Sequence, residues 1–303
     1  MYSGLRDRHR WVLPEVLGEQ ARKRPGNCWI EMTDGGTLTF GQADAEVSLV
    51  AGFFAGLGVK PGDMVAVFLP NGLDFVRVWL GLGRLGAVAV LLNTDLTGSF
   101  LHHQLESCGA ALAVVDRVRL DALRSIGGGL THLRRIIVVD AEKPFDAGPL
   151  EAIGWSAWRS AISYEGGSPR PQDIACIMYT SGTSGPSKGV LMPHAHCYLY
   201  GLGAIDALRL TSEDRYYIVL PLFHANGLLM QLGAALIAGI PAVVRPRFSA
   251  SAWLDDVRRH GVTVTNTLGA VAPFILNRPP SSAERDHALR AIMCAPNLAE
   301  HEA

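Results

Sequence analysis

The residues best suited to chemistry lie between Tyr179 and Val190, in the sequence YTSGTSGPSKGV. This segment holds hydroxyl side chains, glycines and a lysine: Thr180, Ser181, Gly182, Thr183, Ser184, Gly185 and Lys188. The glycines permit backbone conformations that point successive N–H groups into one concavity, which favours an anion. The hydroxyls add donors, and the lysine adds a mobile positive charge suited to phosphate. The segment therefore predicts a loop that binds the phosphates of a nucleoside triphosphate.

Two other interpretations of this segment fit less well. A Walker A loop starting at Gly182 would need glycine at position 187 and Ser or Thr at 189, but the chain has Ser187 and Gly189. A Walker loop also opens a helix, whereas GVLM reads as a strand. A plain Ser/Gly-rich surface loop is the other alternative. An apolar, strand-like run enters the segment and a second follows it at once, which favours the binding loop.

The rest of the chain alternates between strand and helix patterns. Strands are expected at 64–69, 88–92, 111–115, 135–139, 174–179, 190–192, 216–220, 242–245, 262–267 and 290–294. Helices are expected at 73–83, 99–108, 118–126 and 228–238. Another helix is expected to begin near His194, and one capped by Ser249 or Ser251 is expected to end at His260. This alternation predicts an α/β fold with two doubly wound, mainly parallel sheets. The Gly- and Pro-rich stretch 141–173 predicts a connection between an amino-terminal part, 1–172, and a second part, 173–303.

Composition excludes several classes of protein. The 27 Lys and Arg balance 28 Asp and Glu, which argues against a nucleic-acid binder. Five scattered cysteines predict free thiols in a reducing compartment, the cytoplasm, and the amino terminus lacks the apolar core of a secretory signal. The uncharged stretch 227–244 is split by Gly239 and Pro241, so a buried helix and strand are expected there rather than a membrane span.

The segment TSGTSGPSKGV resembles the phosphate-loop motif of the adenylate-forming superfamily, which includes acyl-CoA synthetases, luciferases and peptide-synthetase adenylation domains. Three other stretches agree: 38–71 (LTFGQ…LPN), LPLFHANG and PPSSAERDHALRAIMCAPNLAE. The last is similar to the carnitine/crotonobetaine-CoA ligase branch. The resemblance implies an ATP-dependent acyl-CoA synthetase, with Mg²⁺ required and CoA as co-substrate. A carboxylate would attack ATP to give acyl-AMP and pyrophosphate, and the CoA thiol would then form a thioester.

The resemblance also implies roles for particular residues. Residues 180–185 and Lys188 would hold the β- and γ-phosphates, and Lys188, Thr183 and His224 would be the catalytic residues. His224 would act at the acyl pocket, which 266–271, including Asn266, Gly269 and Ala270, would line. Ala295, Pro296 and Asn297 would pack against adenine. The substrate would be a small carboxylic acid with a hydrocarbon part, and association of identical chains stays open.

Two histidine-containing motifs have simpler interpretations. The HAHC motif at 194–197 is too compact for a closed metal site, so no metal ligands are expected. His102 and His103 are expected on a solvated helix face.

The chain lacks several motifs that the superfamily carries after the adenine segment. These are a Thr-Glu segment that binds Mg²⁺, a ribose-binding aspartate and a carboxy-terminal domain with the adenylation lysine. The sequence is therefore expected to be the amino-terminal part of a larger catalytic body. It could be a fragment of a ligase, a half-enzyme completed by another polypeptide, or a non-catalytic nucleotide- or acyl-binding protein.

Overall fold

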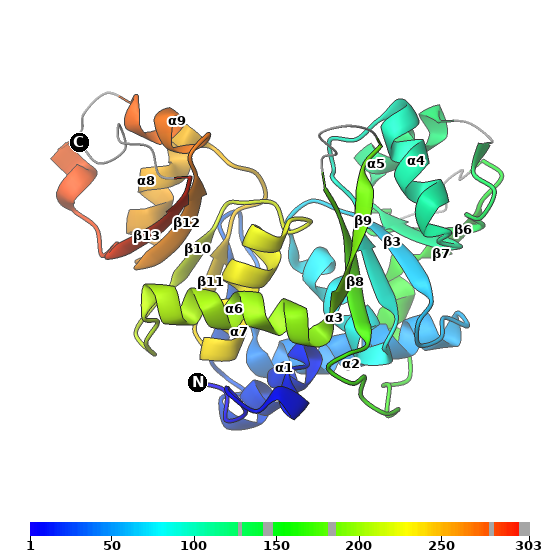
Figure 1. Cartoon of the computed structure of the whole chain (residues 1–303), viewed down its shortest axis with the longest axis horizontal. Coiled ribbons are helices and arrows are strands. Elements are labelled where there is room, and N and C mark those ends of the chain that lie inside the picture. Colours follow the sequence, from blue (N-terminus) through cyan, green and yellow to red (C-terminus); the bar gives the residue numbers. More distant parts are fainter. Residues whose placement is uncertain (127–128, 142–147, 181–185, 279–281, 297–303) are drawn as a thin grey trace.

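The computed structural model describes residues 1–303 except 127–128, 142–147, 181–185, 279–281 and 297–303, and its strands form two sheets (Figure 1). The first sheet has the order β7-β6-β5-β3-β4-β8-β9, and the second has the order β13-β12-β10-β11-β1-β2. Neighbouring strands are parallel except in the pairs β8–β9 and β1–β2. The predicted α/β class with two mainly parallel sheets is confirmed.

The strands of the first sheet are β3 (Met64–Phe68), β4 (Val88–Leu91), β5 (Leu112–Val115), β6 (Arg135–Val138), β7 (Glu151–Gly154), β8 (Ile174–Thr180) and β9 (Lys188–Pro193). Those of the second are β1 (Cys28–Met32), β2 (Thr37–Thr39), β10 (Tyr216–Ile218), β11 (Ala242–Val244), β12 (Val264–Leu268) and β13 (Ala291–Ala295). The α-helices are α1 (Leu13–Lys23), α2 (Phe40–Gly56), α3 (Leu73–Leu85), α4 (Gly98–Cys108), α5 (Arg117–Ser125), α6 (His194–Leu208), α7 (Ala234–Ala238), α8 (Ala250–Arg259) and α9 (Ala272–Leu276).

Each sheet combines strands from both sides of the predicted boundary at 172/173. Cys176 of β8 pairs with Ala89 of β4, and Ile30 of β1 pairs with Ala242 of β11. The sheets therefore do not follow this division, because strand pairing is non-local whereas the Gly- and Pro-rich composition marks only where the chain changes course. The boundary as a division into two folding units stays a prediction.

One hydrophobic core joins the two sheets. Buried side chains of the first sheet, such as Val67, and of the second, such as Tyr216, belong to the same cluster, together with side chains of α1, α2, α3, α6 and α7. Trp29, Phe40 and Tyr198 are among its largest fully buried members. The shared core therefore fixes the carboxyl ends of the strands of one sheet relative to those of the other. A site that uses residues of both sheets depends on this packing.

Local contacts define both ends of helix α2. The backbone N–H of Gln42 donates to Thr39 Oγ1 over 3.1 Å, and the backbone N–H of Thr39 donates to Gln42 Oε1 over 2.9 Å, which completes a capping box. Gly58, just past the helix, has φ +83°, a conformation that glycine adopts without strain. Local side-chain chemistry therefore sets both ends of this helix.

The uncharged stretch 227–244 is buried inside the protein. A π-helix, Asn226–Gly233, leads into α7, and Gly239 at φ +72° turns the chain into β11. Leu228, Leu232 and Leu236 are fully buried. Within the described residues, every helix is too short or too polar to cross a membrane. The predicted helix and strand are confirmed, although the first turns of the helix are wider than an α-helix.

The HAHC motif begins α6 and separates its two histidines. His194 is 2% exposed, whereas His196 is exposed and packs against the ring of Tyr200. Among the described residues, no group of three or more His, Cys, Asp or Glu side chains is placed to hold a metal ion. All five cysteines are free thiols, as predicted; those of Cys176 and Cys197 lie 3.8 Å apart in the core.

Burial of His194 predicts a loss of stability as the pH falls. Desolvation lowers the pKa of His194 from 6.5 to about 4, and its Nε2 makes no hydrogen bond with a described residue. Between these values the unfolded chain binds more protons than the folded one, so the free energy of unfolding decreases as the pH falls. We expect this group to contribute a loss of about 2 kcal/mol between pH 7 and pH 5. Urea unfolding of His194→Asn should show a flatter pH dependence, whereas His196→Asn should match the parent chain.

Candidate nucleotide and acyl site

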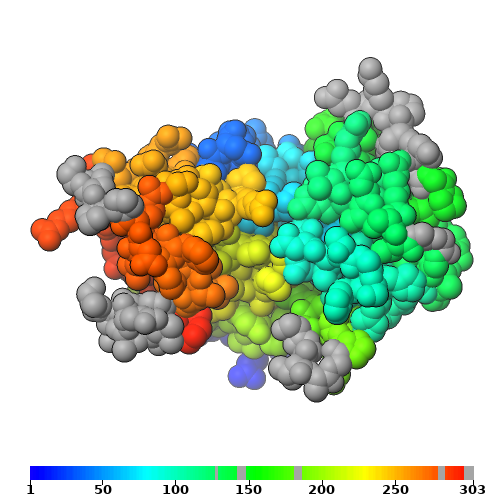
Figure 2. All heavy atoms as spheres, turned by 90° about the horizontal axis from the view of Figure 1, so that it is seen from above, coloured from blue at the N-terminus to red at the C-terminus, as the bar shows by residue number. Residues whose placement is uncertain are grey.

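A pocket of about 390 Å³ lies where the carboxyl ends of β4 and β8 approach the segment after β10. Its described lining residues are Leu91, Asn93, Leu96, Phe100, Gln104, Tyr179, Thr180, Ser187, Phe223 and His224. Figure 2 looks onto this end of the molecule, with the cyan-green segments of the first sheet on one side and the yellow-orange segments of the second on the other. Ligands of open parallel sheets bind beyond the carboxyl ends of their strands, so the pocket is well placed for binding.

Thr180 and Lys188 face each other across the end of the β8–β9 pair. They are register partners, one residue beyond the pair Tyr179 and Gly189. The Lys188 side chain is exposed and makes no hydrogen bond or ion pair with any residue that the structure describes. Its charge is therefore not used by any described residue. The predicted phosphate contacts of Ser181, Gly182, Thr183, Ser184 and Gly185 lie outside the described residues.

His224 lines the same pocket as Thr180, although the two come from different sheets. Its ring packs against Phe223 with centroids 4.5 Å apart and remains exposed on its other side. Partial burial desolvates the imidazole and lowers the pKa of His224 below its ordinary value. Burial therefore favours the neutral imidazole, which can donate or accept a hydrogen bond. The pocket brings together two residues that the sequence analysis assigns to phosphate and acyl binding.

Asn71 holds the segment that presents His224, and sequence reasoning missed it. It follows β3 in the first sheet and is 7% exposed. Its Oδ1 accepts from the backbone N–H of Leu222 over 2.8 Å, and its Nδ2 donates to the carbonyls of Leu220 (3.0 Å) and Arg245 (3.1 Å). One side chain thus joins the end of the first sheet to the loops after β10 and β11. The one signal in the sequence is the place of Asn71, which comes directly after an apolar strand and before the next helix.

Asn266 does not line this pocket but lies in the core of the second sheet. Its Oδ1 accepts from the Tyr216 hydroxyl over 2.6 Å, and its Nδ2 donates to Asn226 Oδ1 over 2.7 Å. The side chain is fully buried, and Asn226 lies two residues after His224. Asn266 therefore connects β12 to the segment that follows His224. A direct contact of Asn266 with an acyl group stays a prediction.

The predicted adenine segment lies beside Gly269. The backbone N–H of Gly269 donates to the carbonyl of Ala295 over 3.3 Å, and a Cβ at position 269 would lie 2.7 Å from the carbonyl oxygen of Pro296. Only glycine allows this approach. Ala270 is exposed next to it, and Asn297 lies outside the described residues. The structure therefore groups Gly269, Ala295 and Pro296 at the ends of β12 and β13, as a second cluster of predicted site residues.

His103 is half-buried rather than fully solvated as expected. Its Nε2 lies 3.0 Å from the carbonyl oxygen of Ser187, and His102 makes a similar contact of 3.1 Å with the carbonyl oxygen of Gly129. The helical pattern placed both rings on a polar face, but it could not reveal that the loop before β9 packs on this face.

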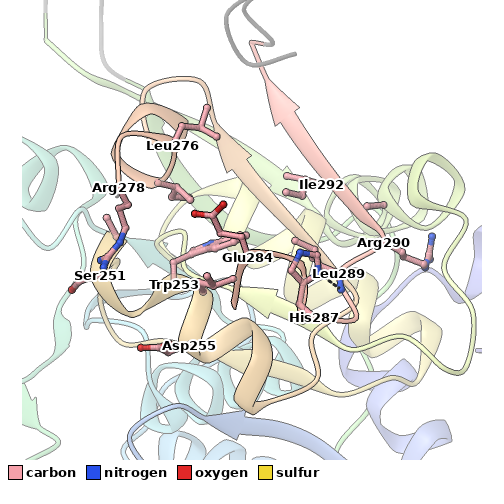
Figure 3. Close-up of a pocket in the computed structure, with 14 residues that line it drawn as sticks. Ser251, Trp253, Asp255, Leu276, Arg278, Glu284, His287, Leu289, Arg290 and Ile292 are labelled. Atoms are coloured by element: carbon pink, nitrogen blue, oxygen red, sulfur yellow. Dashed lines mark hydrogen bonds between the residues drawn. The ribbon is translucent and has the colours of Figure 1, made fainter. Parts of the chain in front are cut away.

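A different pocket, of about 620 Å³, lies between α8, α9 and the edge strand β13 (Figure 3). Its walls are largely apolar, with Trp253, Leu276 and Ile292 among them. None of the predicted site residues lines it. This larger pocket therefore lies apart from the residues that the sequence analysis assigns to a site.

The described residues that line the 390 Å³ pocket offer no Mg²⁺ site of their own. Protein-bound Mg²⁺ is usually held by one or two carboxylates together with substrate phosphates. None of the described residues that line the 390 Å³ pocket carries a carboxylate. A metal ion would therefore have to enter bound to a nucleotide or be held by groups outside this pocket.

The sequence as a whole matches a known family of adenylate-forming enzymes. A family model described as "AMP-binding enzyme" matches residues 17–300. The chain therefore belongs to the AMP-binding enzyme family, and the matched region is the amino-terminal large-domain region of these proteins. The predicted family is confirmed.

Two curated proteins of known name are similar to this chain. The chain is 31% identical to human long-chain fatty acid transport protein 1 over 290 residues, which cover 92% of the chain and 44% of that protein. It is 29% identical to the crotonobetaine/carnitine–CoA ligase of Salmonella typhimurium over 266 residues, which cover 88% of the chain and 52% of the ligase. The chain thus spans about half the length of the curated relatives it matches.

Solved structures agree with the fold. An anthranilate CoA ligase in complex with anthranoyl-AMP superimposes with a TM-score of 0.86 at 26% identity, covering 94% of this chain and 55% of that one. The N-terminal domain of FACL13 from Mycobacterium tuberculosis gives a TM-score of 0.81 at 23% identity, covering 96% of this chain and 71% of that one. The second match supports the fold alone.

Proposed function

We propose that the chain is the amino-terminal part of an ATP-dependent acyl-CoA synthetase. The observation that carries this proposal is the 390 Å³ pocket, because Thr180 at the end of β8 and His224 after β10 both line it. Lys188, the register partner of Thr180, provides a positive charge that has no hydrogen-bond or ion-pair partner among the described residues. A triphosphate and a carboxylate bound to these two groups would have their reacting atoms at one place.

The reaction would need positioning and charge neutralisation more than a strong base. A carboxylate is already nucleophilic at pH 7, so its oxygen attacks the α-phosphorus of ATP and pyrophosphate leaves with the bond electrons. The CoA sulfur then attacks the acyl carbon and releases AMP. Lys188 and Thr180 would hold the phosphates, the neutral His224 would bind a substrate oxygen, and Ala295 and Pro296 would pack against adenine. Mg²⁺ would supply further charge neutralisation as part of the nucleotide complex.

The substrate would be a small carboxylic acid with a hydrocarbon part. Leu91, Leu96 and Phe100 provide apolar walls, while His224 provides a polar end. Fatty acid or carnitine metabolism is the context that the relatives' names suggest. We place the protein in the cytoplasm, because all five cysteines are free thiols. Assembly into homo-oligomers stays open.

A non-catalytic nucleotide- or acyl-binding protein is the alternative. The pocket's described lining residues include no carboxylate, so none of them is suited to hold a catalytic metal ion. Such a protein would bind ATP or acyl groups without forming an adenylate.

Two measurements on the purified 303-residue chain test these functions. Titration calorimetry with ATP and Mg²⁺ should detect binding, and hydroxylamine should trap any acyl-adenylate formed with a series of carboxylic acids. Binding together with hydroxamate supports the synthetase. Binding without hydroxamate favours the binding protein, or a synthetase part that needs the remainder of the catalytic body. Absence of nucleotide binding would contradict the synthetase and a nucleotide-binding protein, and would leave only an acyl-binding protein.

A further inference from the structure

We propose that helix α4 positions Thr180 and Lys188 for phosphate binding, and that Gln104 is the residue through which it does so. This inference rests on the proposed function, since it concerns the residues assigned there to ATP. Gln104 belongs to neither strand of the β8–β9 pair, and it is separated by more than 70 residues from both Tyr179 and Ser187.

Gln104 contacts both sides of the phosphate-binding segment. Its backbone carbonyl accepts from the Tyr179 hydroxyl over 2.9 Å, and its side-chain Nε2 donates to Ser187 Oγ over 3.1 Å. Tyr179 directly precedes Thr180, and Ser187 directly precedes Lys188. A single residue of α4 is therefore bonded to the immediate neighbour of each phosphate-binding residue.

Two further bonds hold the same strands to α4. His103 Nε2 donates to the carbonyl oxygen of Ser187 over 3.0 Å, and Ser107 Oγ lies 2.8 Å from the Tyr179 hydroxyl. We call His103, Gln104, Ser107, Tyr179 and Ser187 the α4 clamp. Because its bonds run to both strands, a displacement of α4 would displace Thr180 and Lys188 with it.

The burial of Gln104 indicates that the clamp is more than a surface contact. The residue is 4% exposed and lines the 390 Å³ pocket. Its Oε1 is buried and makes no hydrogen bond with any described residue. An unpaired buried oxygen is costly, and an apolar side chain at this position would avoid that cost. The bond to Ser187 gives a reason for an amide here.

Phe100 extends the same helix to the mouth of the pocket. It lies four residues before Gln104, one helical turn away, and is largely exposed although it lines the pocket. An acyl group that contacts Phe100 would touch the same helix that carries the clamp. Helix α4 would thus contact both the acyl group and the residues that position Thr180 and Lys188.

A double-mutant cycle tests the clamp. Gln104→Ala and Ser187→Ala remove the same side-chain bond from opposite ends, so each should raise the Kd for ATP·Mg²⁺ about three- to tenfold. The double variant should be no weaker than either single variant, because the bond is already lost. Ser187→Thr keeps the hydroxyl and should retain most of the affinity. His102→Ala, which removes a comparable bond to Gly129 away from the clamp, should leave the Kd unchanged.

Hydrogen exchange of the nucleotide-free chain gives a second, independent readout. Backbone amides at 178–180 and 187–190 should exchange faster in Gln104→Ala than in the parent chain, with little change in the midpoint of thermal unfolding. His102→Ala should leave exchange in these segments unchanged.

The outcomes separate this inference from the proposed function. If Lys188→Ala weakens ATP binding but Gln104→Ala does not, or if the effects of Gln104→Ala and Ser187→Ala simply add, the clamp is wrong and the proposed function stands. If Lys188→Ala has no effect, or no ATP binds, the proposed function fails and hydrogen exchange alone decides whether the clamp exists. Unchanged exchange in Gln104→Ala would then overturn it.

Discussion

Replacement of Lys188 by alanine should weaken the binding of ATP·Mg²⁺ at least tenfold. The ammonium group is exposed at the end of the β8–β9 pair and has no partner among the described residues, so its charge is available to phosphate. A hydrogen bond to a charged group contributes about 1.5–3 kcal/mol, which corresponds to roughly 10- to 150-fold in Kd. Calorimetric titration of the parent and variant chains with ATP·Mg²⁺ measures the effect directly.

The matched control is Lys60→Ala. Lys60 is also an exposed lysine, but it lies in the turn before β3, far along the chain from the phosphate-binding segment. Lys60→Ala removes the same charge from the protein but away from the phosphate-binding segment, so it should change the affinity by less than twofold. Lys188→Arg keeps the charge with a different donor geometry and should give an intermediate affinity. Equal affinities of Lys188→Ala and the parent chain would disprove the phosphate role of Lys188.

Periodicity along the chain predicted most of the elements around this lysine. The expected strands at 64–69, 88–92 and 174–179 correspond to β3, β4 and β8. Short apolar runs bounded by turn residues are typical of buried strands in an α/β fold, which is why they could be predicted. The first 37 residues gave no such signal. There the structure has α1 and β1, and β1 joins the second sheet beside β11, over 200 residues away. Local pattern cannot indicate such a partner.

The same limit applies to the candidate site. The motifs indicated Thr180, Lys188 and His224 because each lies in a recognisable stretch of sequence. Gln104 and Asn71 acquire their roles only from partners 83 and 151 residues away. For Asn266, the family resemblance suggested the acyl pocket, which stays a prediction, but its buried hydrogen bond to Asn226 could not be predicted from the sequence. Residues that position a site are harder to predict than residues that touch a ligand.

Replacement of Asn71 by alanine should lower the free energy of unfolding by about 3 kcal/mol. The variant loses three hydrogen bonds, to Leu220, Leu222 and Arg245, and it leaves the Leu222 N–H without its partner. An ordinary hydrogen bond contributes about 0.5–1.5 kcal/mol, and a stranded buried donor costs about 1–3 kcal/mol. Since domains are stable by only about 5–15 kcal/mol, urea unfolding should show a large shift of the midpoint.

Two further variants separate the role of Asn71 from a general effect of removing an asparagine. Asn93→Ala removes an amide whose Oδ1 accepts a local bond from the N–H of Asp95, over 3.0 Å, so it should cost well under 1 kcal/mol. Asn71→Asp keeps an acceptor for Leu222 but loses the two donors, and should fall between Asn71→Ala and the parent chain. Equal unfolding free energies of Asn71→Ala and Asn93→Ala would mean that the two sheets are joined by their shared core alone. The expected difference would instead show that the segment carrying His224 depends on the first sheet for its position, as a site built from both sheets requires.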